Sequence, residues 1–231
     1  MIATDKLSAG YGSPILENVT ISLGNGSLTC LVGVNGSGKS TLIRTLAGLQ
    51  KPLLGVVCCN GERTDQMTRQ RLSQLVSVVL TDPVHDSLMT VGELVASGRM
   101  PYTGFLGKLS DGDKDIVDAA MERLGVAELA DCRLSHISDG QRQRALIARA
   151  IAQQTPVVML DEPTAFLDFK SRAEVMQLLQ NLAHTDGKAV LCSTHELDLA
   201  ERYGDVFWVV DGGGVVTMDK DGFVSGFFKK C

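Results

Sequence analysis

The sequence predicts an α/β fold with a largely parallel sheet, an antiparallel β region before it and a helical region inserted into it, and three observations support this. Short, strongly apolar runs are typical of strands buried in a parallel sheet, and they occupy residues 28–32, 75–80, 157–160 and 189–193. Short apolar runs separated by turn signals indicate antiparallel strands in residues 1–30. Helical periodicity dominates between residues 91 and 154.

The order of these elements defines the expected organisation of the chain. A helix over residues 40–49 should follow the first buried strand, and the helical region should contain helices at 91–96, 116–124 and 141–151. Residues 98–112, which contain glycines and Pro101, are expected to form an irregular connection. The tail after Trp208 returns to turns and short strands. We expect a single unit, with a core of residues 1–81 and 156–231 and a helical subdomain of residues 82–155.

The composition limits the possible classes of function. With 231 residues, 44% of them hydrophobic, the chain can bury a substantial core. Its formal net charge of -5 argues against a dedicated nucleic-acid binder, because affinity for phosphate backbones comes from clustered Lys and Arg. The longest apolar runs, such as 206–210, are far shorter than the roughly 20 residues that span a bilayer. Because residues 1–6 also lack the features of a secretory signal, we expect a cytosolic chain that reaches membranes through partners.

Six cysteines are present, but they include no CxxC pair and no His at zinc-ligand spacing. We interpret them as reduced thiols. Cys30 and Cys192 lie in apolar runs, where a thiol behaves as a small hydrophobic group.

A glycine-rich loop follows the strand at 28–32. Residues 33–40 fit the pattern GxxxxGK[ST] and open the next helix, which is the context that a phosphate-binding loop requires. Backbone N–H groups and the helix N-terminus attract phosphate, Lys39 reaches the β and γ phosphates, and the Ser40 hydroxyl is suited to Mg²⁺. The alternative is an ordinary glycine turn before a helix. The predicted ATP-binding residues here are Gly33, Asn35, Gly36, Ser37, Gly38, Lys39, Ser40 and Thr41.

The strand at 157–160 ends in two acids, Asp161 and Glu162. Ligands of α/β folds bind at the carboxyl ends of parallel strands, so these carboxylates should lie near the phosphate loop. Asp161 is suited to hold Mg²⁺, directly or through water, and Glu162 to polarise an attacking water. Read alone, the pair could instead cap a helix before Pro163. With the phosphate loop, the pair predicts a P-loop NTPase (RecA-like) core. Kinases, small GTPases and many other NTPases share these two features, so the two motifs alone do not fix the function.

A third motif indicates which family of P-loop proteins the chain resembles. Residues 137–141 read Ile-Ser-Asp-Gly-Gln, which resembles the Leu-Ser-Gly-Gly-Gln signature of ATP-binding cassettes of ABC transporters. Ser138, Gly140 and Gln141 stand before or at the start of a predicted helix, where a hydroxyl, N–H groups and the helix dipole can face an anion. Read alone, the motif could be a Ser N-cap followed by a glycine turn. Ile137 and Asp139 depart mildly from the family's pattern.

The resemblance extends along nearly the whole chain. It implies that Tyr11 stacks on adenine, that Asp168 lies in a loop crossing between two cassettes, and that His195 is the switch histidine. Each residue also has a simpler explanation: Tyr11 could be a half-buried strand aromatic, and His195 a histidine at a helix start. The fixed order of these motifs favours the family reading. In that reading Lys39, Glu162 and His195 are the catalytic residues.

One position departs from the family more strongly. Where the family places a glutamine at the end of the strand after the phosphate loop, this sequence has Thr81. The resemblance implies that this position helps to hold Mg²⁺ and senses the membrane subunit. The shorter Thr81 side chain is expected to reach Mg²⁺ only through water.

The resemblance implies an ATP-binding and ATP-hydrolysing subunit that uses ATP and Mg²⁺ at the inner face of the cell membrane. Its implied partners are a second cassette, transmembrane permease subunits and, indirectly, a substrate-binding protein. Each ATP would be held by Lys39 and Ser40 of one copy and by Ser138 and Gly140 of the other, and the permease would contact a groove near Thr81 and residues 82–105. Phrases at 98–102, 138–144 and 162–168 look most like importers of iron-siderophore, haem or cobalamin.

Three alternatives stay open at this point. The chain could be a soluble cassette ATPase of DNA repair or translation, although it has neither a coiled-coil insertion nor a second cassette. It could serve a transporter with another substrate. It could also be a nucleotide-gated interaction protein without hydrolysis, a reading that only Thr81 supports and that Glu162 and His195 oppose.

Overall fold

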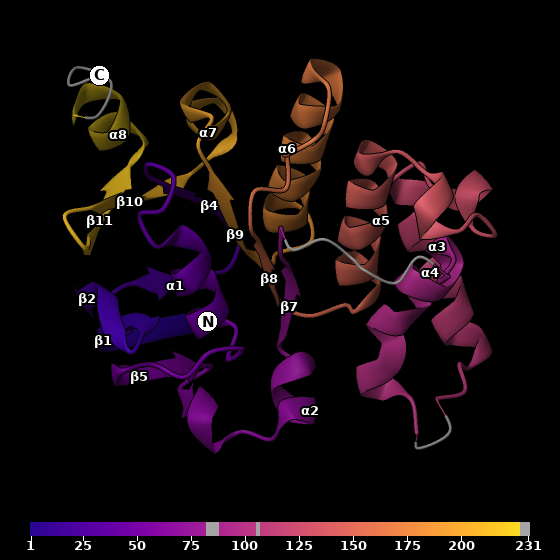
Figure 1. Cartoon of the computed structure of the whole chain (residues 1–231), viewed down its shortest axis with the longest axis horizontal. Helices are drawn as coiled ribbons and strands as arrows, with labels where there is room; N and C mark the ends of the chain where they lie inside the picture. Colours follow the sequence, from indigo (N-terminus) through magenta and orange to yellow (C-terminus); the bar gives the residue numbers. More distant parts are fainter. Residues whose placement is uncertain (82–87, 105–106, 227–231) are drawn as a thin grey trace.

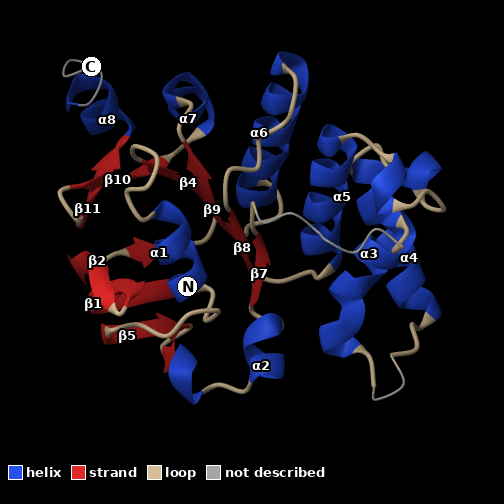
Figure 2. Cartoon of the chain, in the orientation of Figure 1, coloured by secondary structure: helices blue, strands red, loops and turns tan. Residues whose placement is uncertain are grey.

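The structure, a computed structural model, describes residues 1–81, 88–104 and 107–226, and it contains two β-sheets with helices packed around and beside them (Figure 1). The α/β fold predicted from the sequence is confirmed. Both sheets lie on one side of the molecule, and α3, α4 and α5 form a separate helical layer on the other side (Figure 2).

The larger sheet has six strands in the order β11-β10-β4-β9-β8-β7. Neighbouring strands are parallel except for the terminal hairpin of β10 and β11. Their bounds are β4 Ser27–Val32, β7 Val76–Val79, β8 Val157–Leu160, β9 Ala189–Thr194, β10 Val206–Asp211 and β11 Gly214–Asp219. Because β4, β7, β8 and β9 run in register, their carboxyl ends meet at one edge of the sheet.

The smaller sheet is antiparallel and has the order β2-β1-β5-β6, with β3 paired to β1. Its strands are β1 Ile2–Tyr11, β2 Ser13–Val19, β3 Ser22–Leu23, β5 Leu54–Cys59 and β6 Glu62–Arg63. Gly10 at the end of β1 lies so close to the backbone of residues 13–15 that a side chain would clash there. This tight turn carries Tyr11 to the surface.

The α-helices are α1 Lys39–Leu46, α2 Arg69–Ser73, α3 Val91–Ala96, α4 Asp111–Arg123, α5 Asp139–Ala152, α6 Phe169–His184, α7 Leu197–Tyr203 and α8 Lys220–Gly226. Short 3-10 helices occupy η1 Thr64–Gln66, η2 Ser97–Tyr102, η3 Ala127–Leu129 and η4 Leu134–His136. Within the described ranges, no helix combines the length and apolar character that crossing a bilayer requires.

Two apolar cores lie on opposite faces of the larger sheet. In β4, Leu28, Cys30 and Val32 pack into a core shared with the helical layer, α6, α7 and α8. Leu31 of the same strand points to the other face, into a core shared with α1 and the antiparallel sheet. This alternation is the period-2 pattern of a strand covered on both faces. Cys30 and Cys192 are buried there as free thiols, and burial raises the pKa of Cys30 to about 12.

Helix α1 ends at Leu46 rather than 49 and α4 begins at Asp111 rather than 116, and three further differences from the sequence-based expectation have a clear physical cause. Helix α5 begins at Asp139 rather than 141, because Ser138 caps it. The stretch expected to be irregular contains η2, whose Arg99 is buried and pairs with Asp113 at 2.8 Å. The described part of the tail contains α8 as well as strands, and Phe223 of this helix is buried in a stack with Phe207, with ring centroids 4.1 Å apart.

Candidate active site

The phosphate loop joins β4 to α1 at the carboxyl edge of the larger sheet. Gly36 and Gly38 have φ values of 79° and 106°, in the region that favours glycine. At Gly38 a side chain would also press against Ile15 and Leu16, so both the backbone conformation and the available space favour glycine at this position. Helix α1 has no side-chain cap at Gly38, which leaves its first N–H groups free to bind an anion.

Lys39 folds back over its own loop. Its Nζ donates hydrogen bonds to the carbonyl oxygens of Gly33 at 2.8 Å and of Val34 at 3.1 Å, and the residue is buried. Burial lowers the pKa of Lys39, while the carboxylates of Glu162 and Asp161 act in the opposite direction. The ammonium group thus lies beside the acid pair. Ser40 and Asn35 are exposed, and Ser37 and Thr41 are partly or fully buried.

Asp161 is anchored by the strands on both sides of β8. Its Oδ1 accepts a hydrogen bond from Ser193 Oγ at 2.6 Å, and its Oδ2 accepts one from Thr81 Oγ1 at 3.1 Å. The residue is buried, with 1% of its surface exposed. Both oxygens are therefore oriented before any ligand binds, and three strand ends hold one carboxylate in place.

Glu162 occupies a strained backbone position. Its φ of 48° is in the left-handed region, which non-glycine residues rarely adopt, and its N–H donates to Ser193 Oγ at 2.8 Å. One carboxylate oxygen lies 3.5 Å from Nδ1 of His195, and the imidazole is about half exposed. Lys39, Thr81, Asp161, Glu162 and His195 therefore gather at one edge of the sheet.

Two residues at this edge had no role in the sequence-based site. Ser193 joins Asp161 to the backbone of Glu162, as described above. Glu196 accepts hydrogen bonds from Thr164 Oγ1 at 2.8 Å and from Arg172 at 2.7 Å, so it ties the loop after β8 to the segment after β9. In the sequence, Ser193 ends the buried run 189–193 and Glu196 follows it closely, but only the structure shows that this strand pairs with β8.

The signature motif caps helix α5. Ser138 Oγ accepts a hydrogen bond from the Gln141 N–H at 3.2 Å, and the Gln141 side-chain oxygen accepts one from the Ser138 N–H at 2.9 Å. Ser138 therefore caps the helix, as the alternative interpretation of the motif predicted, and the cap is a reciprocal capping box. Asp139 forms an ion pair with Arg142 at 2.7 Å. The Ser138 hydroxyl proton takes no part in the box and can still be donated.

Ser138, Gly140 and Gln141 line a pocket of about 640 Å³ together with Phe166, Leu167 and Asp168. Gly140 allows the close approach, because a Cβ there would lie 3.3 Å from Leu167 Cδ2. Asp168 caps α6 by accepting hydrogen bonds from the N–H and hydroxyl of Ser171, and these bonds lower its pKa. No residue of the phosphate loop lines this pocket.

The predicted site residues therefore fall into two groups within one copy. One group surrounds the carboxyl edge of the larger sheet. The other group, Ser138, Gly140, Gln141 and Asp168, forms the signature pocket. Tyr11, at the end of β1, is 66% exposed and free to stack on a planar ligand.

The donor set suits a hard divalent cation, since Ser40, Thr81 and Asp161 offer hydroxyl and carboxylate oxygens. Among the described residues, no three His, Cys, Asp or Glu side chains group in a way that could hold a metal ion. Both oxygens of Asp161 already accept hydrogen bonds. Mg²⁺ would fit here only together with phosphate oxygens or water.

Comparisons with known proteins agree with this geometry. Residues 16–165 match the family model described as ABC transporter. The iron(3+)-hydroxamate import ATP-binding protein of Bacillus subtilis is 36% identical over 93% of this chain and 80% of its own length. The achromobactin transport ATP-binding protein of Dickeya dadantii is 40% identical over 88% of this chain and 76% of its own length. A dimeric structure of a bacterial ABC transporter cassette, 26% identical, has a TM-score of 0.84 and covers 95% of this chain and 99% of that one. These likenesses confirm the predicted P-loop fold.

Proposed function

The chain belongs to the ABC transporter family of ATP-hydrolysing cassettes, and from that premise we propose that it powers the import of a metal chelate such as an iron-siderophore, haem or cobalamin complex. The names of the relatives support this substrate class, since they include iron(3+)-hydroxamate import and achromobactin transport. The chain would work at the cytoplasmic face of the membrane, attached to permease subunits and served indirectly by a substrate-binding protein.

The division of the site into two groups is the observation that carries the mechanism. The signature pocket contains no residue of the phosphate loop, so one copy supplies two partial sites. In a head-to-tail pair, the Ser138 hydroxyl and the α5 N-terminus of one copy would face the γ-phosphate that lies on Lys39 of the other. A dimeric cassette among the similar structures supports such pairing.

Each residue at the sheet edge then has a defined task. Lys39 would exchange the carbonyl oxygens of Gly33 and Val34 for the β and γ phosphates, which replaces neutral acceptors by charged ones. Glu162, held by its strained backbone, would orient and polarise the attacking water, and His195 would stabilise the developing charge. Ser40 and Asp161 would hold Mg²⁺, with Thr81 acting through water, and the bound ion would neutralise charge on the phosphates.

Hydrolysis would separate the pair and move the permease, which we place against the groove between the end of β7 and the helical layer. Of the stretch 82–105 expected to contact the permease, residues 82–87 and 105 lie outside the described residues. Residues 88–104 include α3 and η2, which pack beside α5.

The tests separate an ATPase from a binding module and a transporter subunit from a soluble enzyme. Glu162→Gln should abolish steady phosphate release while ATP and Mg²⁺ convert the chain to a stable dimer on gel filtration. A variant that stays monomeric at saturating ATP would refute the composite site. The tagged wild-type chain, isolated from its own cells in mild detergent, should retain a polytopic membrane protein, which a repair or translation ATPase would not.

A further inference from the structure

The loop that follows the acid pair joins the two parts of the site within one copy. Residues 163–168 begin directly after Glu162 at the sheet edge and end at Asp168, which lines the signature pocket. In the proposed head-to-tail pair these two parts face different ATP molecules, because the sheet edge holds one nucleotide and the signature pocket faces the other. The position of this loop therefore affects both nucleotides.

The loop has a strained backbone. Phe166 has a φ of 64°, in the left-handed region that Glu162 also occupies. Non-glycine residues keep this conformation only where their surroundings hold it. The Phe166 side chain is 70% exposed, and the bonds within the loop are two turn bonds, from the Ala165 N–H to the Glu162 carbonyl oxygen and from the Leu167 N–H to the Thr164 carbonyl oxygen. Contacts from outside the loop are therefore needed to fix it.

One carboxylate outside the loop is linked to both of its ends. The Glu196 N–H donates to Thr194 Oγ1 at 3.0 Å, at the end of β9. Glu196 Oε1 accepts a hydrogen bond from Thr164 Oγ1 at 2.8 Å, near the start of the loop. Glu196 Oε2 accepts one from Arg172 Nη1 at 2.7 Å, and Arg172 Nε donates to the carbonyl oxygen of Leu167 at 2.9 Å, near the end of the loop. Glu196 and Arg172 thus form a clamp across the loop.

The clamp contributes geometry more than stability. A guanidinium is planar, so the angle between its Nε and Nη1 donors is fixed, and the Glu196 carboxylate sets the direction from which Arg172 holds the Leu167 carbonyl oxygen. Thr164 and Leu167 are buried, so the clamp acts on the inner side of the loop. The side chains of Arg172 and Glu196 are 38% and 21% exposed, and an ion pair this accessible to water adds little to the free energy of unfolding.

The end of the loop is also tied to the signature helix. Ser171 Oγ donates to Asp168 Oδ2 at 2.8 Å and accepts a hydrogen bond from Arg144 Nη2 at 2.7 Å. Arg144 lies on α5, which begins at the signature motif. Ser171 and its neighbour Arg172 both lie in the first turn of α6, so this turn connects α5 with the segment after β9.

We propose that Glu196 and Arg172 are positioning residues, which hold the loop 163–168 in its strained conformation and so fix the signature pocket of a copy relative to its own sheet edge. The proposal rests on the proposed function, because only in a pair do both parts of the site meet a nucleotide. Without the clamp the loop relaxes toward ordinary backbone angles, while the bonds that hold Asp161 stay in place. Each copy then still binds nucleotide, but two copies pair less tightly.

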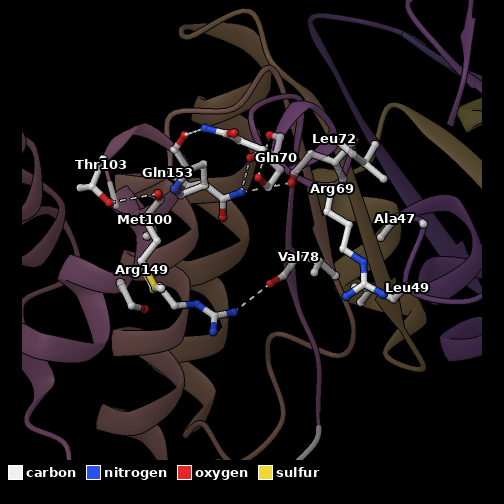
Figure 3. Close-up of a pocket in the computed structure, with 17 residues that line it drawn as sticks. Ala47, Leu49, Arg69, Gln70, Leu72, Val78, Met100, Thr103, Arg149 and Gln153 are labelled. Carbon is white, nitrogen blue, oxygen red and sulfur yellow. Dashed lines mark hydrogen bonds between the residues drawn. The ribbon is translucent and has the colours of Figure 1, made fainter. Parts of the chain in front are cut away.

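The clamp lies apart from the groove where the permease is placed. That groove has a volume of about 990 Å³, and its walls come from the end of α1, from α2 and η2, and from the carboxyl half of α5 (Figure 3). Its described lining includes neither Arg172 nor Glu196. Loss of the clamp should therefore weaken pairing without reducing the amount of permease that the chain retains.

Pairing of the purified chain tests the clamp. In the Glu162→Gln background, ATP and Mg²⁺ should produce a dimer, whose dissociation constant is measured by sedimentation over a series of protein concentrations. Adding Arg172→Gln or Glu196→Ala should raise that constant about tenfold or more, while the affinity of the monomer for ADP stays within about twofold. ADP lacks the γ-phosphate, so its equilibrium dialysis reports on the sheet edge alone. A merely structural role would lower ADP affinity and the melting temperature together.

Three further variants sharpen the test. Arg123→Gln breaks an ion pair of similar exposure between Arg123 and Asp186, at 2.9 Å, and should pair as the parent chain does. Arg172→Lys keeps the charge but not the fixed geometry of two donors, so it should restore pairing only in part. Arg172→Gln and Glu196→Ala together should pair no more weakly than the weaker single variant, because both changes break the same clamp.

Unchanged pairing in both Arg172→Gln and Glu196→Ala would overturn the inference. So would a double variant whose defect is the product of the two single defects, or a loss of ADP affinity equal to the loss of pairing. If the Glu162→Gln chain with an intact clamp forms no dimer at saturating ATP, the composite site of the proposed function fails instead.

Discussion

The two halves of the site are held in place in different ways. At the sheet edge, Asp161 is buried and fixed by hydrogen bonds from Thr81 and Ser193 on the flanking strands. At the signature pocket, Ser138 and Gln141 are exposed and bond to each other in a local capping box. The first half is organised by tertiary structure, and the second by one helix turn.

On the proposed mechanism, this difference means that one copy would bind nucleotide alone but would need a second copy for turnover. The Asp161 carboxylate at the sheet edge is already held by hydrogen bonds, and the Lys39 ammonium lies beside the acid pair on its own loop. A capped helix N-terminus keeps its dipole and a spare hydroxyl proton, but within one copy its pocket includes no part of the phosphate loop.

Removing the cation from the rigid half should have the largest effect. Lys39→Ala leaves the loop carbonyl oxygens of Gly33 and Val34 to water and deprives the phosphates of their only lysine in the loop. We expect phosphate release to fall about 10²-fold or more, with the melting curve nearly unchanged. Lys51→Ala, at an exposed lysine after α1, should behave as wild type. Full turnover by the Lys39 variant would refute its assigned role.

Mixing two inactive variants tests whether the halves come from different copies. Ser138→Ala and Lys39→Ala should each be inactive alone, but a head-to-tail pair containing one of each has one intact site. Random pairing should therefore restore about a quarter of the wild-type sites. The fraction of restored sites is measured as phosphate release at a series of mixing ratios of the two variants.

The control for that mixture is another helix cap. Ser110→Ala breaks the equivalent capping box of α4 and should cost about 1 kcal/mol of stability, as Ser138→Ala does, without loss of turnover. If the mixture stays inactive while both single variants remain folded, the active site lies within one copy.

A smaller effect is expected where the rigid half departs from the family pattern. Thr81→Val removes the hydroxyl that donates to Asp161 Oδ2, so the carboxylate keeps only its bond from Ser193. We expect half-saturation with Mg²⁺ to require severalfold more metal and the unfolding free energy to fall by about 1 kcal/mol. Thr81→Ser, which keeps the hydroxyl, is the matched control. A Mg²⁺ titration that does not move in Thr81→Val would exclude Thr81 from the metal site.

The same contrast decides what the sequence could predict. The resemblance to ABC cassettes and the α/β fold are confirmed. Both could be predicted because the glycine loop and the buried strands are local patterns in the sequence. The roles of Ser193 and Glu196 depend on which strands lie side by side, and no local pattern contains that information. Helix α8 was missed for the same reason, since its one buried residue, Phe223, is explained by a stack with distant Phe207.

The smallest effect is expected from one charge in the signature pocket. Asp168 has a pKa below its ordinary value of 3.8, because the N–H and hydroxyl of Ser171 donate to its carboxylate. Its ionised form therefore adds stability that is present above about pH 4 and is lost as the pH falls through the lowered pKa. Asn caps a helix about as well as Asp, so Asp168→Asn removes mainly the charge. The variant should melt about 1–2 °C below wild type at pH 6, and the gap should close as the pH falls below 4. A constant difference in melting temperature from pH 6 to pH 3 for Asp168→Asn would mean that the cap acts through shape rather than charge.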